Sequence, residues 1–367
     1  MRIGILISSI GNFGQKGFYN SQEIGLAKML ARDGNDVIVY KLLKKDAAVP
    51  SNETNGRMEI RYFPVRKIGN NGLVNTDIID INLDKLVYFA DTQLSVTRVY
   101  KWCQKHNITF IPYIGVIESH STNVVAKKLI DTLFFRNVEV YNRCISLAKN
   151  TDVKEKLVAK GVKHVEIAPV GIDFDLLNPN FEMLDRQSAK EELGFEYMDR
   201  VVLLVGRIES DRNPLDSVSV FKELKNHDKK FKLLIVGNGS LKTELFALLQ
   251  QGNLERDVKY IEKIPNSEMW KIYRAAELLI TFSRTEIFGM SILEAMYYGT
   301  VVHAVNAPGP NDILIKNESG FLYESAVDME KSIINNLEKS ENITRDAHER
   351  VLRQFSWSKT AKIVEEY

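Results

Sequence analysis

Short apolar runs alternate with amphipathic stretches along the chain, and this alternation constrains the fold more than any other feature. A strand, a helix and another strand make the repeating unit of a parallel sheet with crossover helices. In the first half, strands are expected at 2–8, 37–40, 109–117 and 164–169, and helices at 92–106, 124–135 and 150–160. The pattern predicts an α/β fold with a doubly wound sheet.

The pattern breaks at 168–179, where two prolines and a glycine bracket a turn-rich segment that indicates a domain boundary. A second alternating series follows. Its expected strands lie at 200–206, 231–236, 258–262, 277–282 and 301–304, and its expected helices at 213–226, 240–251, 267–276, 290–298 and 326–339. Two successive doubly wound domains predict a cleft between them, with ligands bound at the carboxyl ends of the strands.

The last segment, 343–367, carries apolar residues at roughly helical spacing, so it is expected to bury one face against another part of the chain. The two cysteines, Cys103 and Cys144, are expected to be small buried side chains in a reducing compartment. The first residues do not resemble a signal peptide, and no apolar run approaches the ~20 residues of a membrane helix. These observations predict a cytoplasmic protein.

Charge is unevenly spread. The chain carries a net charge of +1, but residues 1–165 hold 24 Lys and Arg against 15 Asp and Glu, a balance of +9, which leaves −8 for the remainder. One interpretation is that the first half faces an anion, either a phosphorylated acceptor or an anionic membrane surface. The other is a scattered, solvated surface, because the basic residues do not run together.

The densest functional signal is a pair of glutamates around a Phe-Gly turn at 286–294. Glu286 precedes a predicted helix, and Glu294 lies inside it. Phe288 and Gly289 come directly before the helix. The backbone N–H groups of Gly289, Met290 and Ser291 at the start of this helix would bind a diphosphate. Both carboxylates can accept hydrogen bonds from sugar hydroxyls.

A second signal lies after the strand at 200–206. Arg207 follows its last glycine, and Arg212 comes five residues later. Two cations near a strand end would hold a pyrophosphate and stabilise the charge on a departing nucleoside diphosphate.

Two weaker signals lie in the first domain. The loop ending at Gly17 joins the first strand to the first helix, a place where backbones often approach phosphate. It carries no Gly-x-Gly-x-x-Gly fingerprint, which disfavours a nicotinamide dehydrogenase. Glu118 and His120 follow a buried strand and are candidates for positioning a reacting hydroxyl.

Together these segments resemble glycosyltransferase family 4, whose retaining enzymes have two Rossmann-like domains in the GT-B architecture. The second half carries the resemblance most strongly, through Val205-Gly206-Arg207, Tyr273 to Ala276, the 286–294 motif and Gly320-Phe321-Leu322. Phe355-Ser356-Trp357 resembles the start of a final helix that crosses back onto the first domain. The resemblance implies an acceptor-side domain at 1–172 with 350–367, and a donor-binding domain at 173–349.

The resemblance also implies roles. Glu286 would hold the sugar hydroxyls and Glu294 the nucleotide ribose. Arg207 and Arg212 would bind the diphosphate, with arginine at 212 where lysine is usual. Further donor contacts would come from Gly17, Ile264, Phe288, Gly289, Met290 and Ser291. His120 would lie near the transferred sugar, although the register from Pro112 places Glu118 at the usual position.

The expected activity is metal-independent, retaining transfer of a hexosyl or N-acetylhexosaminyl group from a nucleotide-sugar, with UDP favoured. The expected acceptor is a cell-surface glycan or a lipid-linked molecule, with peripheral membrane contact through the basic first domain and no nucleic-acid partner. No cofactor is expected, because the nucleotide-sugar is a substrate. Three alternatives stay open: a sugar-nucleotide epimerase, a phosphorylase, and a non-catalytic nucleotide-sugar-binding subunit.

Overall fold

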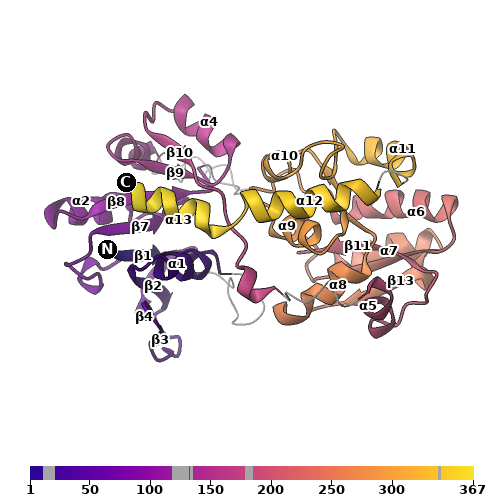
Figure 1. Ribbon diagram of the computed structural model, residues 1–367, viewed down its shortest axis with the longest axis horizontal. Helices are drawn as coiled ribbons and strands as arrows, with labels where there is room; N and C mark the ends of the chain where they lie inside the picture. The colour runs from indigo at the N-terminus through magenta and orange to yellow at the C-terminus, as the bar shows by residue number, and fades with distance from the viewer. Residues whose placement is uncertain (11–20, 118–131, 133–134, 178–184, 338–339) are drawn as a thin grey trace. The chain divides into compact units, whose positions relative to one another are not determined.

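The structure is a computed structural model that describes residues 1–10, 21–117, 132, 135–177, 185–337 and 340–367. The chain divides into two compact units, and each is described by itself. The first unit consists of Met1–Gly171 and Trp357–Tyr367, and the second of Ile172–Ser356. Both are Rossmann-like α/β units, which confirms the fold class expected from the sequence (Figure 1).

The first unit is built on an eight-stranded sheet with the order β10-β9-β8-β7-β1-β2-β4-β3, parallel except for β3. The strands are β1 (Arg2–Ile7), β2 (Asp36–Lys44), β3 (Glu53–Asn55), β4 (Met58–Val65), β7 (Lys85–Phe89), β8 (Thr109–Ile114), β9 (Ser146–Ala148) and β10 (Val165–Ile167). All five residues of β7 are buried, as expected for a central parallel strand covered on both faces. A short antiparallel pair, β5 (Lys67–Ile68) and β6 (Asn71–Gly72), accompanies the sheet.

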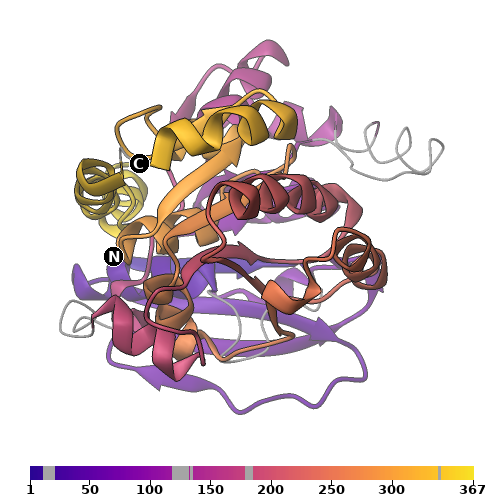
Figure 2. The same cartoon turned by 90° about the vertical axis from the view of Figure 1, so that its right-hand side faces the viewer.

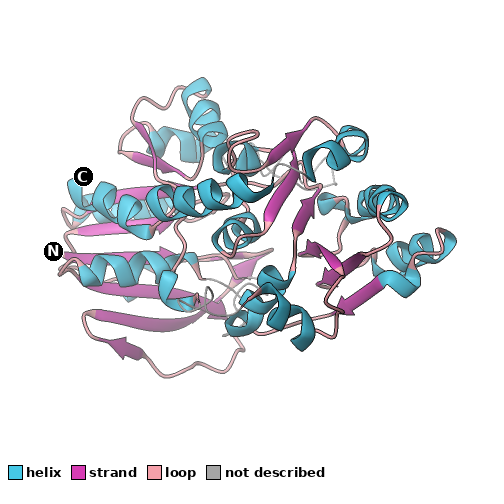
Figure 3. Cartoon of the chain, turned by 45° about the vertical axis from the view of Figure 1, so that its right-hand side comes forward, coloured by secondary structure: helices cyan, strands magenta, loops and turns pink. Residues whose placement is uncertain are grey.

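Helices cover both faces of this sheet (Figure 3). One face packs against α2 (Val96–Lys105), the helix at 135–141 and α4 (Thr151–Ala159), which share one hydrophobic core with the strands. The helices α1 (Gln22–Arg32) and α13 (Trp357–Glu366) pack against each other. Their contact is close: a Cβ added to Gly25 would lie 2.1 Å from Nε1 of Trp357.

The final helix of the chain is anchored to the first unit by polar contacts as well. Lys85 donates from Nζ to the carbonyls of Val364, at 3.0 Å, and Glu365, at 2.6 Å, near the end of α13. Thr360 donates from Oγ1 to the carbonyl of Pro169 at 2.6 Å. These contacts confirm that the last helix returns to the first unit, where it buries the apolar face seen in the sequence.

The second unit has a six-stranded parallel sheet with the order β13-β12-β11-β14-β15-β16 (Figure 2). Its strands are β11 (Arg200–Val205), β12 (Phe231–Val236), β13 (Val258–Ile261), β14 (Leu278–Thr281), β15 (Val301–Val305) and β16 (Phe321–Tyr323). Its helices are α5 (Arg186–Glu192), α6 (Ser217–His227), α7 (Lys242–Gln251), α8 (Met269–Ala275), α9 (Met290–Tyr297), α10 (Pro308–Ile313), α11 (Ala326–Asn336) and α12 (Ser340–Gln354).

Most expected elements of the second unit are confirmed, because its apolar runs are long and sharply bounded. The segment expected as one final element is divided, since α12 ends at Gln354 and α13 begins at Trp357. The residues 350–356 therefore group with the second unit, where α12 packs against α9. In the first unit the sequence analysis missed β4, β7 and β9, and the helix predicted at 124–135 falls almost entirely outside the described residues.

Two further expectations concern burial and membranes. Cys103 is buried as expected, whereas Cys144 is only partly buried; both are free thiols, and burial raises the pKa of each to about 12. Within the described ranges, no helix combines the length and the apolarity that crossing a bilayer requires.

His303 in β15 makes the second unit sensitive to acid. Its ring is fully buried, and its Nδ1 lies 2.7 Å from the hydroxyl of Tyr323. Burial lowers the pKa of His303 to about 3. Because an unfolded histidine has a pKa of about 6.5, the unfolded chain takes up a proton between pH 6.5 and 3 while the folded chain does not. Stability is therefore lost as the pH falls through this window.

We predict that wild-type protein loses about 2 kcal/mol more unfolding free energy between pH 7 and pH 5 than the His303→Gln variant, which cannot titrate there. Urea unfolding at both pH values measures the difference. Equal pH dependence in the two proteins would show that His303 is not protonated on unfolding in this range.

Candidate active site

The carboxyl-terminal edge of the second sheet is shaped by backbones that approach each other closely. Gly206 after β11 and Gly237 after β12 have φ values of 132° and 141°. A Cβ added to Gly237 would lie 1.9 Å from the carbonyl oxygen of Gly206, so only glycine fits at 237. Beyond the glycines, Ile208 donates from its N–H to the carbonyl of Asn238 at 3.0 Å, and its own carbonyl accepts from Leu241.

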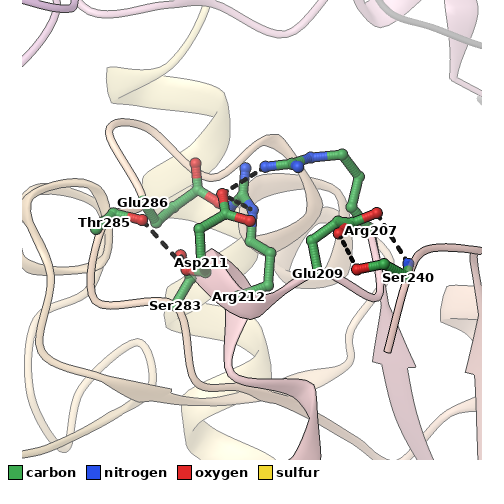
Figure 4. A network of polar contacts seen from close by, with 8 residues as sticks. All are labelled: Arg207, Glu209, Asp211, Arg212, Ser240, Ser283, Thr285 and Glu286. Atoms are coloured by element: carbon green, nitrogen blue, oxygen red, sulfur yellow. Dashed lines mark hydrogen bonds and ion pairs between the residues drawn. The ribbon is translucent and has the colours of Figure 1, made fainter. Parts of the chain in front are cut away.

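The loop after β11 is also fastened to the loop after β14. Ser283 and Thr285 donate from their hydroxyls to the carbonyl of Asp211, at 3.3 and 3.2 Å (Figure 4). Asn213, in the left-handed region with φ 47°, donates from Nδ2 to the carbonyl of Phe282 at 3.2 Å. These bonds hold the 206–213 and 282–286 segments side by side, although they are about 70 residues apart in the sequence.

Two arginines and two carboxylates meet between these loops. Arg212 forms an ion pair from Nη1 with Oε2 of Glu286. Arg207 pairs from Nη2 with Oδ2 of Asp211 at 2.5 Å, and the same oxygen lies 3.8 Å from Nε of Arg212. Figure 4 shows the Asp211 carboxylate beside the guanidinium group of Arg212, with that of Arg207 reaching towards it. The structure thus brings together Arg207, Arg212 and Glu286, which the sequence analysis assigned to one site from different segments.

The start of α9 lies next to this cluster along the chain. Gly289 is the N-cap of α9, with φ 96°. Three residues earlier, the carbonyl of Glu286 accepts a hydrogen bond from the N–H of Gly309 at 2.7 Å. A Cβ on Gly309 would lie 2.3 Å from the carbonyl of Phe288, so α10 packs directly on this turn. The first N–H groups of a helix have no partner within it, and the helix dipole adds positive potential there. The turn therefore offers Met290 and Ser291 as anion-binding groups.

Glu294 is positioned by a tyrosine that the sequence analysis did not assign. Tyr273 of α8 is 1% exposed and donates from its hydroxyl to Oε2 of Glu294 at 2.7 Å. Burial, together with the charge of Glu294, raises the pKa of Tyr273 well above its ordinary value, so this hydroxyl keeps its proton. The sequence signal was the Tyr273 to Ala276 segment, but spacing alone does not pair Tyr273 with Glu294.

Glu209 was likewise not assigned from the sequence. Its two carboxylate oxygens accept from the N–H and the hydroxyl of Ser240, at 3.0 and 2.6 Å. These hydrogen bonds lower the pKa of Glu209 and fasten the loop after β11 to the loop after β12 (Figure 4).

The remaining candidates have mixed outcomes. Ile264 is half-buried and follows β13, on the same edge of the sheet. Gly17, Glu118 and His120 lie outside the described residues, so their assignments stay predictions. Among the residues that are described, no group of three His, Cys, Asp or Glu side chains is placed to hold a metal ion.

This geometry suits a ligand that has both phosphate and hydroxyl groups. Guanidinium groups and helix N–H groups bind phosphate oxygens, and carboxylates accept from sugar hydroxyls. All of these groups lie after strand ends on one edge of a parallel sheet, where ligands of doubly wound folds bind.

Comparison with known proteins agrees with this chemistry. Residues 185–352 match the family model described as "Glycosyl transferases group 1". A D-inositol 3-phosphate glycosyltransferase from Segniliparus rotundus is 29% identical over 165 residues, which cover 44% of this chain and 36% of that protein. The second unit is therefore a glycosyl transferases group 1 domain. This confirms the family resemblance and supports an enzyme that transfers sugars.

Solved structures show the same fold over the whole chain. Sucrose-phosphate synthase from Thermosynechococcus elongatus matches with a TM-score of 0.76 at 17% identity, covering 100% of this chain and 97% of that one. HepE from Anabaena, solved with UDP, matches with a TM-score of 0.73 at 17% identity, covering 100% and 99%. The matches to the first curated relatives span only between 36% and 59% of their length.

We predict that Gly237→Ala destabilises the protein by about 3 kcal/mol or more, because it adds both backbone strain and a collision with Gly206. Gly206→Ala is the matched control, since its φ is similar but nothing lies within 4 Å of an added Cβ. It is expected to cost less, about 1–2 kcal/mol, from backbone strain alone. Urea unfolding measures both variants, and equal losses would contradict the close approach of the two backbones.

Proposed function

We propose that the chain is a retaining, metal-independent glycosyltransferase that takes a sugar from a nucleotide-sugar, with UDP as the nucleotide. The observation that carries this proposal is the Arg212–Glu286 pair with Arg207 beside it, at the turn into α9. It places phosphate-binding cations and a hydroxyl-binding carboxylate within one small cluster. The HepE structures with UDP and with UDP-glucose support the choice of donor.

The leaving group is the first part of the mechanism. When the bond between the sugar and the diphosphate breaks, negative charge develops on the diphosphate. Arg207, Arg212 and the N–H groups at the start of α9 would stabilise that charge, because preorganised donors need no rearrangement as the charge appears. Two cations held on neighbouring parts of one loop supply the stabilisation that a metal ion gives in other transferases, which is why we propose metal independence.

Glu286 and Glu294 would orient the donor. Glu286 would accept from hydroxyls of the transferred sugar, and its pairing with Arg212 would place the sugar next to the diphosphate. Glu294, held by Tyr273, would accept from hydroxyls of the ribose. We propose that the acceptor hydroxyl attacks from the face that the diphosphate leaves and passes its proton to the departing diphosphate oxygen, which gives retention at the anomeric carbon.

We further propose that the acceptor carries negative charge, as a phosphorylated or lipid-linked molecule of the cell surface. The support is the balance of +9 over residues 1–165, which make up most of the first unit. The relative named for D-inositol 3-phosphate agrees with a phosphorylated acceptor. A basic surface raises the local concentration of an anionic acceptor and speeds its binding.

We predict that Glu286→Ala lowers kcat about 100-fold or more while the protein stays folded, because the sugar loses the carboxylate that orients it. Turnover of UDP-glucose and of UDP-N-acetylglucosamine, as transfer or as slow donor hydrolysis, measures the effect. Glu349→Ala is the matched control, because it removes an exposed glutamate that pairs with Arg353 on α12 of the same unit. Near-normal kcat in Glu286→Ala would contradict the role assigned to this residue.

We also predict that turnover is unchanged when EDTA is added to excess over all divalent metal. Arg207 and Arg212 supply positive charge from the chain itself, so leaving-group stabilisation does not depend on a bound ion. A loss of activity that Mg²⁺ restores would overturn the metal-free mechanism without excluding sugar transfer.

A further inference from the structure

We propose that Asp211 is an internal counter-ion that occupies the place of the donor diphosphate between Arg207 and Arg212, and that donor binding displaces it. This inference rests on the proposed function, and it adds a residue that sets the affinity for the diphosphate. It begins with the observation that the carboxylate contacts both arginines through the same oxygen, Oδ2, at 2.5 Å from Arg207 Nη2 and 3.8 Å from Arg212 Nε.

The charges of the two arginines are already balanced by carboxylates. Arg207, Arg212, Asp211 and Glu286 together have a formal charge of zero before any ligand arrives, and the Glu209 carboxylate, which interacts electrostatically with Arg207, adds a further negative charge. A diphosphate cannot gain the full attraction of two cations that are already neutralised. One carboxylate has to give up its arginine contacts, and Asp211 is the one that bridges the two cations (Figure 4).

The side chain of Asp211 is free to move while its main chain is held. The main chain of Asp211 is held by Ser283 and Thr285, which both donate to its carbonyl. Its side chain is 45% exposed, and the side chain of Arg207 is 53% exposed. An exposed ion pair between such side chains is weak, whereas a diphosphate offers several charged oxygens at once. The carboxylate can therefore rotate out towards water while the loop keeps its shape.

Glu286 differs from Asp211 in both respects. Its side chain is only 19% exposed, and its carbonyl is bound by the N–H of Gly309. Glu286 pairs with Arg212 alone in the contacts described here, so Arg212 keeps one carboxylate when Asp211 leaves. Glu286 therefore stays in place to bind the sugar, whereas Asp211 is displaced by the phosphates.

The consequence is that Asp211 weakens the binding of the product nucleoside diphosphate and speeds its release. Removing the carboxylate charge leaves the arginines free to bind phosphate. Asp211→Asn is nearly the same size as the wild-type side chain and lies in an exposed position, so the fold is preserved. We expect this variant to bind UDP about three- to tenfold more tightly, mainly through slower dissociation.

The test measures UDP affinity by isothermal titration calorimetry and dissociation by stopped flow, using wild type, Asp211→Asn and Asp346→Asn. Asp346 is the matched control, since it is also an exposed aspartate next to an arginine in sequence, pairing with Arg345 at 3.6 Å on α12. Its variant is expected to bind UDP as wild type does. Unchanged or weaker UDP binding in Asp211→Asn would overturn the inference.

The Arg207→Gln variant shows whether the gain in UDP affinity depends on Arg207. In Arg207→Gln, where the main partner of Asp211 is missing, adding Asp211→Asn should increase UDP affinity less than it does in wild type. An equal gain in both backgrounds would show that Asp211 does not act by occupying Arg207.

Different results would contradict the proposed function and the role of Asp211. If wild-type protein binds none of UDP, ADP and GDP, the proposed function fails, and if it binds ADP or GDP but not UDP, the choice of UDP as the nucleotide fails. If wild type binds one of them and Asp211→Asn binds it no more tightly, only the role of Asp211 fails.

Discussion

The ion pair between Arg212 and Glu286 is the interaction on which the candidate site depends. It joins the segment after β11 to the segment after β14, two neighbouring strands of the second sheet. Because parallel strands end at the same edge, a short loop after each one suffices to bring these side chains into contact. The pair fixes a cation for the phosphates next to a carboxylate for the sugar, and the other groups of the site are arranged around it.

Backbone contacts make this arrangement rigid. Gly206 and Gly237 allow the first two loops to touch, and the hydroxyls of Ser283 and Thr285 tie the third loop to Asp211. Fixed loops matter for catalysis because donors aimed at a developing charge are effective only if they do not have to reorganise. Mobility is confined to exposed side chains such as Arg207 and Asp211, where exchange of a carboxylate for a phosphate requires little work.

The sequence predicted the second unit well, because its strands are mostly apolar runs, of which β11 and β12 end directly before a glycine. Arg207, Arg212, Glu286 and Gly289 all stand at such strand or helix ends, where position along the chain determines position on the sheet. Tyr273 could not be assigned in this way, because its bond to Glu294 depends on how α8 packs beside α9. Asp211 directly precedes Arg212 in the sequence, but spacing does not reveal which arginine a carboxylate will pair with. In the first unit the sequence analysis missed β7, although four of its five residues are apolar. Its first residue, Lys85, is buried because its ammonium group donates to a carbonyl near the end of α13, which is far away in the sequence.

The measurement that tests the central claim most directly is a crystal structure of the protein with UDP. The account predicts that the diphosphate lies against the first N–H groups of α9, with Arg207 and Arg212 bound to its oxygens and the ribose hydroxyls at Glu294. A diphosphate bound away from these arginines, with the start of α9 in contact with water alone, would contradict it.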